Sequence, residues 1–276
     1  MSRTVHVLRR GALAGVAACA FSGAALAATA SAPKISPQGP NNPAALRMAR
    51  VIAVNPDQVR YARFEFLPPR GNGAAIATGK YRAFAGFPRA GSQFGILSTG
   101  CANIAAKPNN RGDSGCRDAG HRIDGATDVT QLDMKLRVPK GANCLSFRFR
   151  FLSEEYPEFV KSDFNDTFLA MYDKPSWQAQ GGTRVKAPAN FAVTRDGHKI
   201  GVNNTTLARV SPGNAKGTTY DAATRVLRAS HPTRPGTHWL FLTIFDQGDR
   251  QYDSAAFVDQ LTLNHRASCQ SGLAKG

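Results

Sequence analysis

The segment 145–152 is the feature that most restricts how this chain folds. Its sequence, LSFRFRFL, alternates three phenylalanines with two arginines. Successive side chains of a β-strand point to opposite faces, whereas a helix repeats only after about 3.6 residues. The alternation therefore predicts a strand that buries its phenylalanines in an apolar core and turns Arg148 and Arg150 away from it.

Short apolar or alternating segments recur along the chain, with glycine and proline between them. Helical periodicity of useful length is limited to residues 43–54, with a brief further stretch at residues 154–160. Many short strands separated by turns are typical of sandwiches of the jelly-roll type. We therefore predict an all-β fold, a jelly-roll-like β-sandwich with a short N-terminal helix. The expected strands are residues 61–67, 132–138, 145–152, 168–172, 238–245 and 255–263, with a hairpin over residues 190–203.

The first 27 residues have the form of an export signal. Three arginines precede an apolar run, and Ala-Leu-Ala at 25–27 supplies the small residues that signal peptidase requires. Residues 1–27 are thus predicted to be removed, which leaves a secreted or surface protein without a membrane-spanning segment. The alternative is a lipoprotein that is cleaved before Cys19 and anchored through it.

The rest of the chain is expected to form one domain. Residues 28–43 are rich in proline and predict a flexible linker, residues 44–265 the β-sandwich, and residues 266–276 a polar C-terminal tail. The formal net charge is +16, and loss of the three signal arginines leaves 32 basic against 19 acidic residues, or +13. Such a surface suits an anionic glycan or a cell-wall polymer. No specific nucleic-acid binding is expected, because no motif for it is present.

Four cysteines remain once the signal is removed. An even number in an exported chain predicts two disulfides, and four cysteines allow three pairings. Cys101 and Cys116 flank a single loop, so a local bridge between them is the simplest arrangement. Cys144 would then pair with Cys269 and fasten the C-terminal end to the domain.

Two acidic segments carry the candidate site. Residues 153–166, SEEYPEFVKSDFND, and residues 246–254, DQGDRQYDS, each begin where a predicted strand ends. If the two strands run parallel or lie in facing sheets, their acidic ends meet at one rim. Carboxylate, amide and backbone oxygens are the ligands that Ca²⁺ takes in proteins. The predicted metal ligands are Glu154, Glu155, Asn165, Asp166, Asp246, Asp249 and Asp253.

Other interpretations of these acids stay open. Spacing alone favours ion pairs with the many basic residues, such as Arg148 or Arg250, as strongly as it favours Ca²⁺. The third interpretation, less favoured than these two, is that a pair of the carboxylates hydrolyses glycosides. A serine-protease interpretation of Gly-Asp-Ser-Gly at 112–115 fails, because the only upstream histidine is His6, inside the signal.

The acidic segments belong to a wider pattern. Residues 94–100 (FGILSTG), the run 147–168 and residues 246–257 (DQGDRQYDSAAF) together resemble the choice-of-anchor L domain of exported bacterial proteins. The resemblance covers most of residues 44–265. It implies a secreted or surface β-rich domain and brings no established activity. Because both acidic segments are part of the resemblance, it favours a shared metal or ligand site over incidental ion pairs.

The sequence therefore predicts a secreted, non-enzymatic binding or adhesion module of the cell surface or extracellular matrix, stabilised by Ca²⁺. The alternatives are a glycan-active hydrolase that uses two of the same carboxylates, and a structural surface-layer component.

Overall fold

The computed structural model describes residues 33–37, 42–68, 73–107, 112–114, 123, 125–180, 184–204, 206–248 and 250–276. The chain divides into two units, residues 1–31 and 32–276, and all described residues belong to the second. The predicted signal peptide with Cys19 lies outside the described residues, as do Cys116 and Asp249. None of the described helices is long and apolar enough to cross a membrane.

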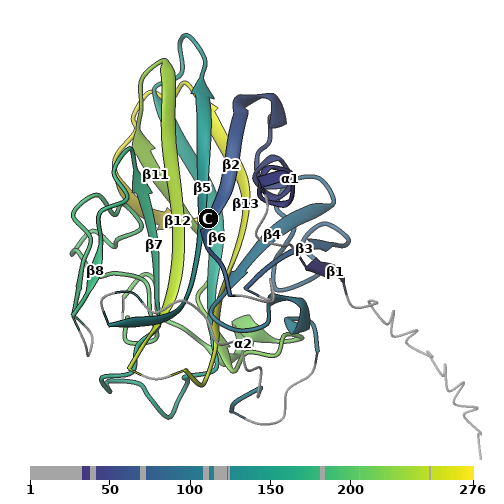
Figure 1. The fold of residues 1–276 in the computed structure, drawn as a ribbon, viewed down its shortest axis with the longest axis vertical. Coiled ribbons are helices and arrows are strands. Elements are labelled where there is room, and N and C mark those ends of the chain that lie inside the picture. Colours follow the sequence, from purple (N-terminus) through teal and green to yellow (C-terminus); the bar gives the residue numbers. More distant parts are fainter. Residues whose placement is uncertain are drawn as a thin grey trace, which may run out of the picture. The chain divides into compact units, whose positions relative to one another are not determined.

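Two antiparallel sheets form the domain and lie one behind the other in Figure 1. Within the described residues the larger sheet has eight strands, in the order β1-β3-β4-β13-β6-β11-β14 with β10 paired to β6. The smaller has four, in the order β2-β5-β12-β7, and β8 and β9 form a separate pair. The predicted all-β, jelly-roll-like sandwich with a short N-terminal helix is confirmed.

The strands have the following bounds. The larger sheet contains β1 (Lys34–Pro37), β3 (Ala74–Thr78), β4 (Gln93–Ser98), β6 (Cys144–Ser153), β10 (Ala222–Ala223), β11 (Leu227–Pro232), β13 (Ser254–Asn264) and β14 (Gly272–Lys275). The smaller sheet contains β2 (Val59–Phe66), β5 (Ala126–Val138), β7 (Thr167–Tyr172) and β12 (Gly236–Gln247). The remaining elements are β8 (Gln178–Ala179), β9 (Val185–Lys186), α1 (Asn42–Ile52), α2 (Pro212–Ala215) and the 3-10 turns η1 (Pro56–Gln58) and η2 (Ala102–Ile104).

The main apolar core lies between the two sheets. As predicted from the alternation, Phe147, Phe149 and Phe151 of β6 belong to this core, together with Leu242 and Ile244 of β12 from the facing sheet. All five side chains are at most 1% exposed. Burial of large apolar side chains from both sheets is therefore what holds the two layers together.

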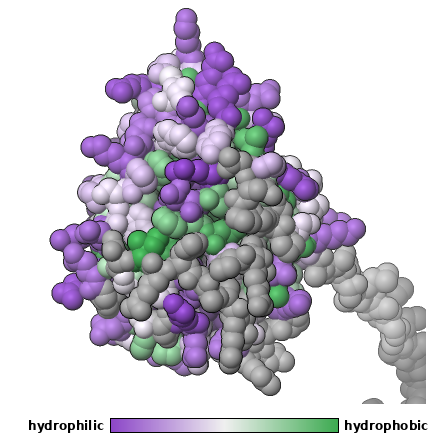
Figure 2. All heavy atoms as spheres, in the orientation of Figure 1, coloured by the Kyte–Doolittle hydropathy of each residue, from purple (hydrophilic) through white to green (hydrophobic). Residues whose placement is uncertain are grey.

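Two smaller apolar clusters cover the outer faces of the sheets. Phe84, Phe87 and Phe94 pack with Phe257 against the outside of the larger sheet. On the outside of the smaller sheet, Phe245 and its neighbours lie under the segment that carries β8 and β9. Apolar side chains gather across the middle of the face seen in Figure 2. Each sheet thus has apolar packing on both sides, which explains why β12 is almost continuously apolar.

Helix α1 confirms the predicted N-terminal helix and packs beside β2 and β4 (Figure 1). Its apolar face, which includes Met48 and Ile52, is buried in the main core. A Cβ placed on Gly95 of β4 would lie 2.8 Å from Cδ1 of Ile52. The absence of a side chain at Gly95 therefore allows the helix to approach the sheet closely.

Both ends of the described chain differ from the prediction. Residues 34–37, predicted as linker, form β1 and pair with β3, and residues 272–275, predicted as a polar tail, form β14 and pair with β11. The predicted disulfide between Cys144 and Cys269 is present, with Cα atoms 5.6 Å apart. Backbone pairing needs no apolar side chains, so these edge strands left little signal in the sequence. The Cys101–Cys116 pairing stays a prediction.

Candidate functional site

The two predicted acidic segments meet at one end of the sandwich. β6 and β13 pair so that Ser153 lies opposite Ser254, and the N–H of Glu154 donates to the carbonyl of Asp253 at 3.0 Å. Asp246 lies near the end of β12 in the facing sheet. Five predicted ligands are buried there, with 0–4% of each residue exposed: Glu154, Glu155, Asp166, Asp246 and Asp253. These five residues are the acid cluster.

Asp166 and Asp246 are the central members of the acid cluster. Within the described part of the chain, none of their four carboxylate oxygens has a hydrogen-bond partner, although all are shielded from solvent. Burial raises the pKa of both groups well above the usual value, and the charges of Glu155 and Asp166, respectively, raise it further. The Ser254 hydroxyl near Asp166 and the Thr99 hydroxyl near Asp246 lower the pKa without completing a hydrogen bond, and burial outweighs both effects. Two carboxylates in this setting need a proton or a cation.

The two glutamates have donors of their own, but only Glu155 lies beside this pair, because the charges that act on Glu154 are those of Asp113 and Asp221. An Oε2 oxygen of Glu155 accepts from the N–H of Asp166 at 3.0 Å, and an Oε2 oxygen of Glu154 accepts from the N–H of Ser114 at 3.0 Å. Burial nevertheless raises the pKa of Glu154 to about 7. Ser114 belongs to the Gly-Asp-Ser-Gly segment, so this segment contributes a backbone donor to the acid cluster rather than a nucleophile.

Gly100 forms part of the wall around Asp253. A Cβ placed on Gly100 would lie 1.9 Å from Oδ2 of Asp253, and the Thr99 hydroxyl donates to the other oxygen at 3.5 Å. This close contact with Gly100 keeps the Asp253 carboxylate turned toward the other members of the acid cluster.

Gly100→Ala is expected to displace Asp253 and to lower the free energy of unfolding by about 1–3 kcal/mol, as other overpacked sites do. Gly213→Ala is the matched control, because nothing lies within 4 Å of the added Cβ. Urea denaturation of both variants measures the effect. Equal stability of the two variants would mean that the Asp253 side chain has room to move.

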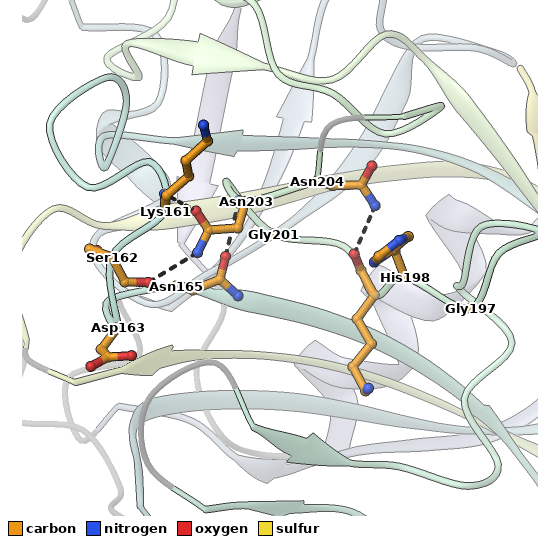
Figure 3. A pocket seen from close by; sticks show the side chains of 10 residues that line it. Lys161, Ser162, Asp163, Asn165, Gly197, His198, Gly201, Asn203 and Asn204 are labelled. Atoms are coloured by element: carbon orange, nitrogen blue, oxygen red, sulfur yellow. Dashed lines mark hydrogen bonds between the residues drawn. The ribbon is translucent and has the colours of Figure 1, made fainter.

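Asn165, predicted as a metal ligand, is engaged elsewhere. Its Oδ1 accepts from the N–H of Asn203 at 3.1 Å, and Asn203 in turn donates from Nδ2 to the carbonyl of Ser162 at 3.2 Å. These side chains line a pocket of about 450 Å³ that also contains Lys161 and Asn204 (Figure 3). The pocket shares a wall with the acid cluster, because a Cβ on its lining residue Gly201 would lie 2.7 Å from the carbonyl of Asp166.

The ion-pair interpretation finds no support at the two central acids among the described residues. Neither Asp166 nor Asp246 forms an ion pair with a basic residue in the described ranges. Arg148 points to the other side of the larger sheet, where its Nε donates to Gln260 Oε1 at 3.1 Å. Arg250 is exposed. Among the described residues, no group of three or more His, Cys, Asp or Glu side chains is placed so that it could hold a metal ion, and Asp249 lies outside these residues.

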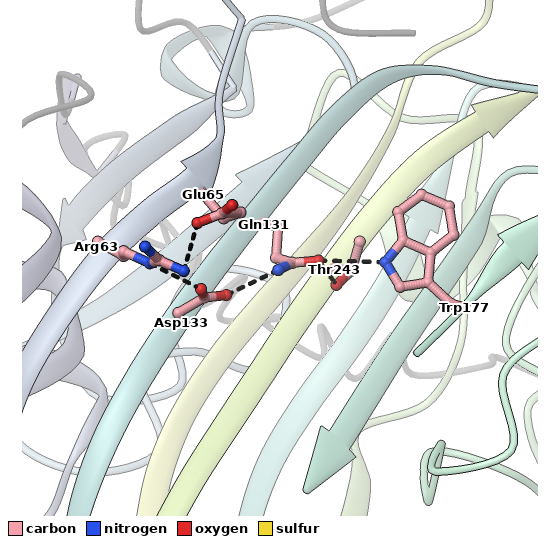
Figure 4. Close-up of polar contacts among 6 residues, drawn as sticks. All are labelled: Arg63, Glu65, Gln131, Asp133, Trp177 and Thr243. Atoms are coloured by element: carbon pink, nitrogen blue, oxygen red, sulfur yellow. Dashed lines mark hydrogen bonds and ion pairs between the residues drawn. The ribbon is translucent and has the colours of Figure 1, made fainter. Parts of the chain in front are cut away.

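A satisfied buried carboxylate elsewhere provides a comparison. Asp133, on the outer face of the smaller sheet, is 1% exposed and accepts from Arg63 Nε at 3.1 Å and from Gln131 Nε2 at 2.8 Å (Figure 4). The oxygen of the same Gln131 amide accepts from Thr243 and Trp177 at 2.9 and 3.3 Å. This chain therefore gives a structural carboxylate both a cation and a donor, which makes the bare oxygens of the acid cluster a deviation that needs a cause.

Three solved structures align with about three quarters of this chain, with low sequence identity and low TM-scores. They are the carbohydrate-binding module TmCBM61 with beta-1,4-galactotriose (7% identity, TM-score 0.28, 74% of this chain and 88% of that chain), the mannan-recognising carbohydrate-binding module TmCBM27 (12%, 0.27, 76% and 86%) and the K2 cleaved adhesin domain of Lys-gingipain (10%, 0.28, 74% and 89%). The chain matches none of the curated proteins with which it was compared.

A family model covers most of the domain. The model of the choice-of-anchor L domain matches residues 69–264. This range includes both acidic segments, Gly100 and the strands β6, β7, β12 and β13. Membership of this family indicates an exported protein of the cell surface. The resemblance seen in the sequence is confirmed: this chain belongs to the choice-of-anchor L domain family.

Proposed function

We propose that this chain is a non-enzymatic binding module of the cell surface whose acid cluster holds a Ca²⁺ ion. One observation carries the proposal: the four carboxylate oxygens of Asp166 and Asp246 are buried and have no donor in the described part of the chain. An unpaired buried charge is costly, and a bound cation removes that cost. Asp253 and Glu155 would add further oxygen ligands.

The chemistry of the donors favours Ca²⁺ over softer metals. The acid cluster consists of carboxylates, with neither His nor Cys among its members. Hard cations such as Ca²⁺ and Mg²⁺ take oxygen ligands, and Ca²⁺ accepts six to eight of them in flexible arrangements. A cation here would join β6, β12 and the segment before β13, and so would fix the loops at this end of the sandwich. Asp249 and Glu154 remain proposed as supporting residues of the same site, and Asn165 would support it from the neighbouring pocket.

The same burial argues against the hydrolase alternative. A glycosidase places its two carboxyl groups about 5–10 Å apart on either side of an accessible glycosidic bond. The acid cluster is at most 4% exposed at every member, so a polysaccharide chain has no path to these carboxylates. A metal-bound carboxylate is also held in its ionised form and is a poor proton donor. The ligand of the module is instead proposed to be an anionic polysaccharide or cell-wall polymer, attracted by the net charge of +13 after signal removal.

The proposal is tested by thermal unfolding in EDTA and in millimolar Ca²⁺. A ligand bound only by the native state stabilises it by about 2.7 kcal/mol at a hundredfold excess over Kd. Wild type is therefore expected to unfold at a clearly higher temperature in Ca²⁺, and Asp246→Asn is expected to abolish most of this difference. Asp163→Asn, an exposed acid of the same segment, is the matched control and should behave as wild type. Identical wild-type curves in EDTA and Ca²⁺ would refute the metal site.

A further inference from the structure

Five arginines gather on the outer face of the larger sheet, away from the acid cluster. Arg148 and Arg150 alternate with the core phenylalanines of β6 and therefore point outward. Arg228 of β11 lies directly opposite Arg148 in the register of the two strands. Arg89 and Arg266 lie close to Arg148 as well, since their charges act on it. We call these five residues the arginine belt.

Like charges directly opposite each other on neighbouring strands destabilise a sheet. The pairing of Arg148 with Arg228 is such a position, and nothing in the described residues offsets it by an ion pair. Asp259 of β13, the other strand that neighbours β6, also lies opposite Arg148. Its carboxylate forms no ion pair with Arg148 and accepts from the backbone N–H groups of Arg89 and Ala90 at 2.5 and 2.9 Å. The arginine belt therefore carries positive charge that the fold itself does not neutralise.

Burial adds to this cost. The Nε atoms of Arg89, Arg150, Arg228 and Arg266 are shielded from solvent and have no hydrogen-bond partner within the described ranges. Burial lowers the pKa of Arg150 to about 10, with a further contribution from Arg89. Burial and the surrounding arginines likewise lower the pKa of Arg148. Arg148, Arg150 and Arg266 each donate one side-chain hydrogen bond, but only to a neutral acceptor. No carboxylate in the described ranges forms an ion pair with the arginine belt, so a partner for its charge is to be sought in a ligand.

We infer that the arginine belt is the surface on which this module binds an acidic polysaccharide, with sugar carboxylates supplying the missing negative charge. The inference rests on the proposed binding function and gives it a location and a ligand chemistry. Arginine suits this role because its planar guanidinium group forms paired hydrogen bonds with a carboxylate. Charges carried on β6, β11 and the segments beside them can meet carboxylates that repeat along an extended chain.

The structure favours a polysaccharide over a nucleic acid. The arginine belt lies on the outer face of the larger sheet, and none of its five residues belongs to a helix that could enter a groove of duplex DNA. The family is one of exported cell-surface proteins. Duplex DNA, which is also a polyanion, is therefore a competitor in the test rather than the expected ligand.

The test measures retention of the protein on immobilised hyaluronate, a polymer with a regularly repeated uronate, with neutral dextran for comparison. Wild type is expected to bind hyaluronate at low salt, to release at high salt and to ignore dextran. Arg148→Gln with Arg228→Gln is expected to weaken binding by about tenfold or more, as loss of central charged contacts does. Arg47→Gln with Arg50→Gln, both on the exposed face of α1, removes the same charge and should change binding less than about threefold.

A second readout separates a binding surface from a structural one. Without polymer, the Arg148→Gln, Arg228→Gln variant is expected to unfold at a higher temperature than wild type, because the cross-strand repulsion is gone. If the two double variants lose affinity equally, overall charge drives binding. The proposal that the arginine belt is the binding surface is then overturned, while the proposal that the chain is a binding module stands. Tighter binding of duplex DNA than of hyaluronate, or a belt variant that binds normally, also overturns the inference. Absence of any hyaluronate binding by wild type overturns it too, and calcium-dependent unfolding still tests the metal site separately.

Discussion

In EDTA, the protein is expected to lose about 3 kcal/mol of unfolding free energy through Glu154 alone as the pH rises from about 4.5 to about 7. The pKa of Glu154 is raised from 4.5 to about 7 in the folded state, chiefly by burial. The folded protein therefore keeps a proton on Glu154 in a pH range where the unfolded chain has released it. Stability contributed by this proton is present at low pH and is lost as the pH rises through the folded pKa.

The central acids of the cluster act in the same direction. Burial and neighbouring carboxylates raise the pKa of Asp166 and of Asp246 well above the usual value, so the metal-free protein also resists their ionisation. Bound Ca²⁺ reverses this preference, because a cation favours the ionised carboxylates. The stabilisation by Ca²⁺ is thus expected to be small near pH 5 and to grow toward pH 8.

Urea unfolding at a series of pH values measures how the free energy of unfolding depends on pH, both in EDTA and in Ca²⁺. Glu154→Gln should remove the Glu154 part of the decline in EDTA, because glutamine does not titrate. The exposed Glu158→Gln, four residues away, serves as the control and should leave the decline close to that of wild type. A metal-free protein that becomes more stable between pH 5 and pH 7 would contradict this description of the acid cluster.

Phe149→Ala is expected to destabilise the fold by about 3–5 kcal/mol, the usual cost of removing a large side chain from a packed core. Phe149 is 0% exposed, and its ring centroid lies 5.0 Å from that of Phe168 and 5.7 Å from that of Phe147. The substitution would leave a cavity between the two sheets that the flanking strands cannot close.

The effect of Phe149→Ala is read from urea or thermal unfolding. Tyr81→Ala is the control, since Tyr81 is 54% exposed and its loss should change stability by no more than about 0.5 kcal/mol. A Phe149→Ala effect as small as that of Tyr81→Ala would show that the sheets are not joined through this core. Both proteins should still retain the Cys144–Cys269 disulfide, which mass spectrometry of non-reduced peptides checks.

The sequence predicted those strands that bury apolar side chains at alternate positions. Residues 145–152 and 238–245 lie within β6 and β12, because their patterns are imposed by the core between the sheets. β11 was missed, since LRASHP mixes small, polar and apolar residues. Without β11 the sequence offers no reason to place Arg228 beside Arg148, so the arginine belt was visible only in the fold.

The sequence predicted that the two acidic segments lie close together, and it did not predict the environment in which they lie. Both acidic segments follow strands whose ends lie at one end of the sandwich, so proximity of Glu155, Asp166 and Asp246 followed from the strand pattern. Their burial did not follow, because it depends on contacts made by distant parts of the chain. Gly100, which lies against Asp253, is an example, and no local pattern marks it.

Calorimetric titration of Ca²⁺ into EDTA-stripped protein near pH 7.5 tests the metal site most directly. Wild type is expected to take up Ca²⁺ with saturation and to release protons from the acid cluster, so that the measured heat depends on the buffer. Asp166→Asn is expected to weaken binding by about tenfold or more, equivalent to about 1.4 kcal/mol, while Asp163→Asn leaves it unchanged. Wild-type protein that takes up no Ca²⁺, or an Asp166→Asn variant that binds it as wild type does, would contradict a cation site at the acid cluster.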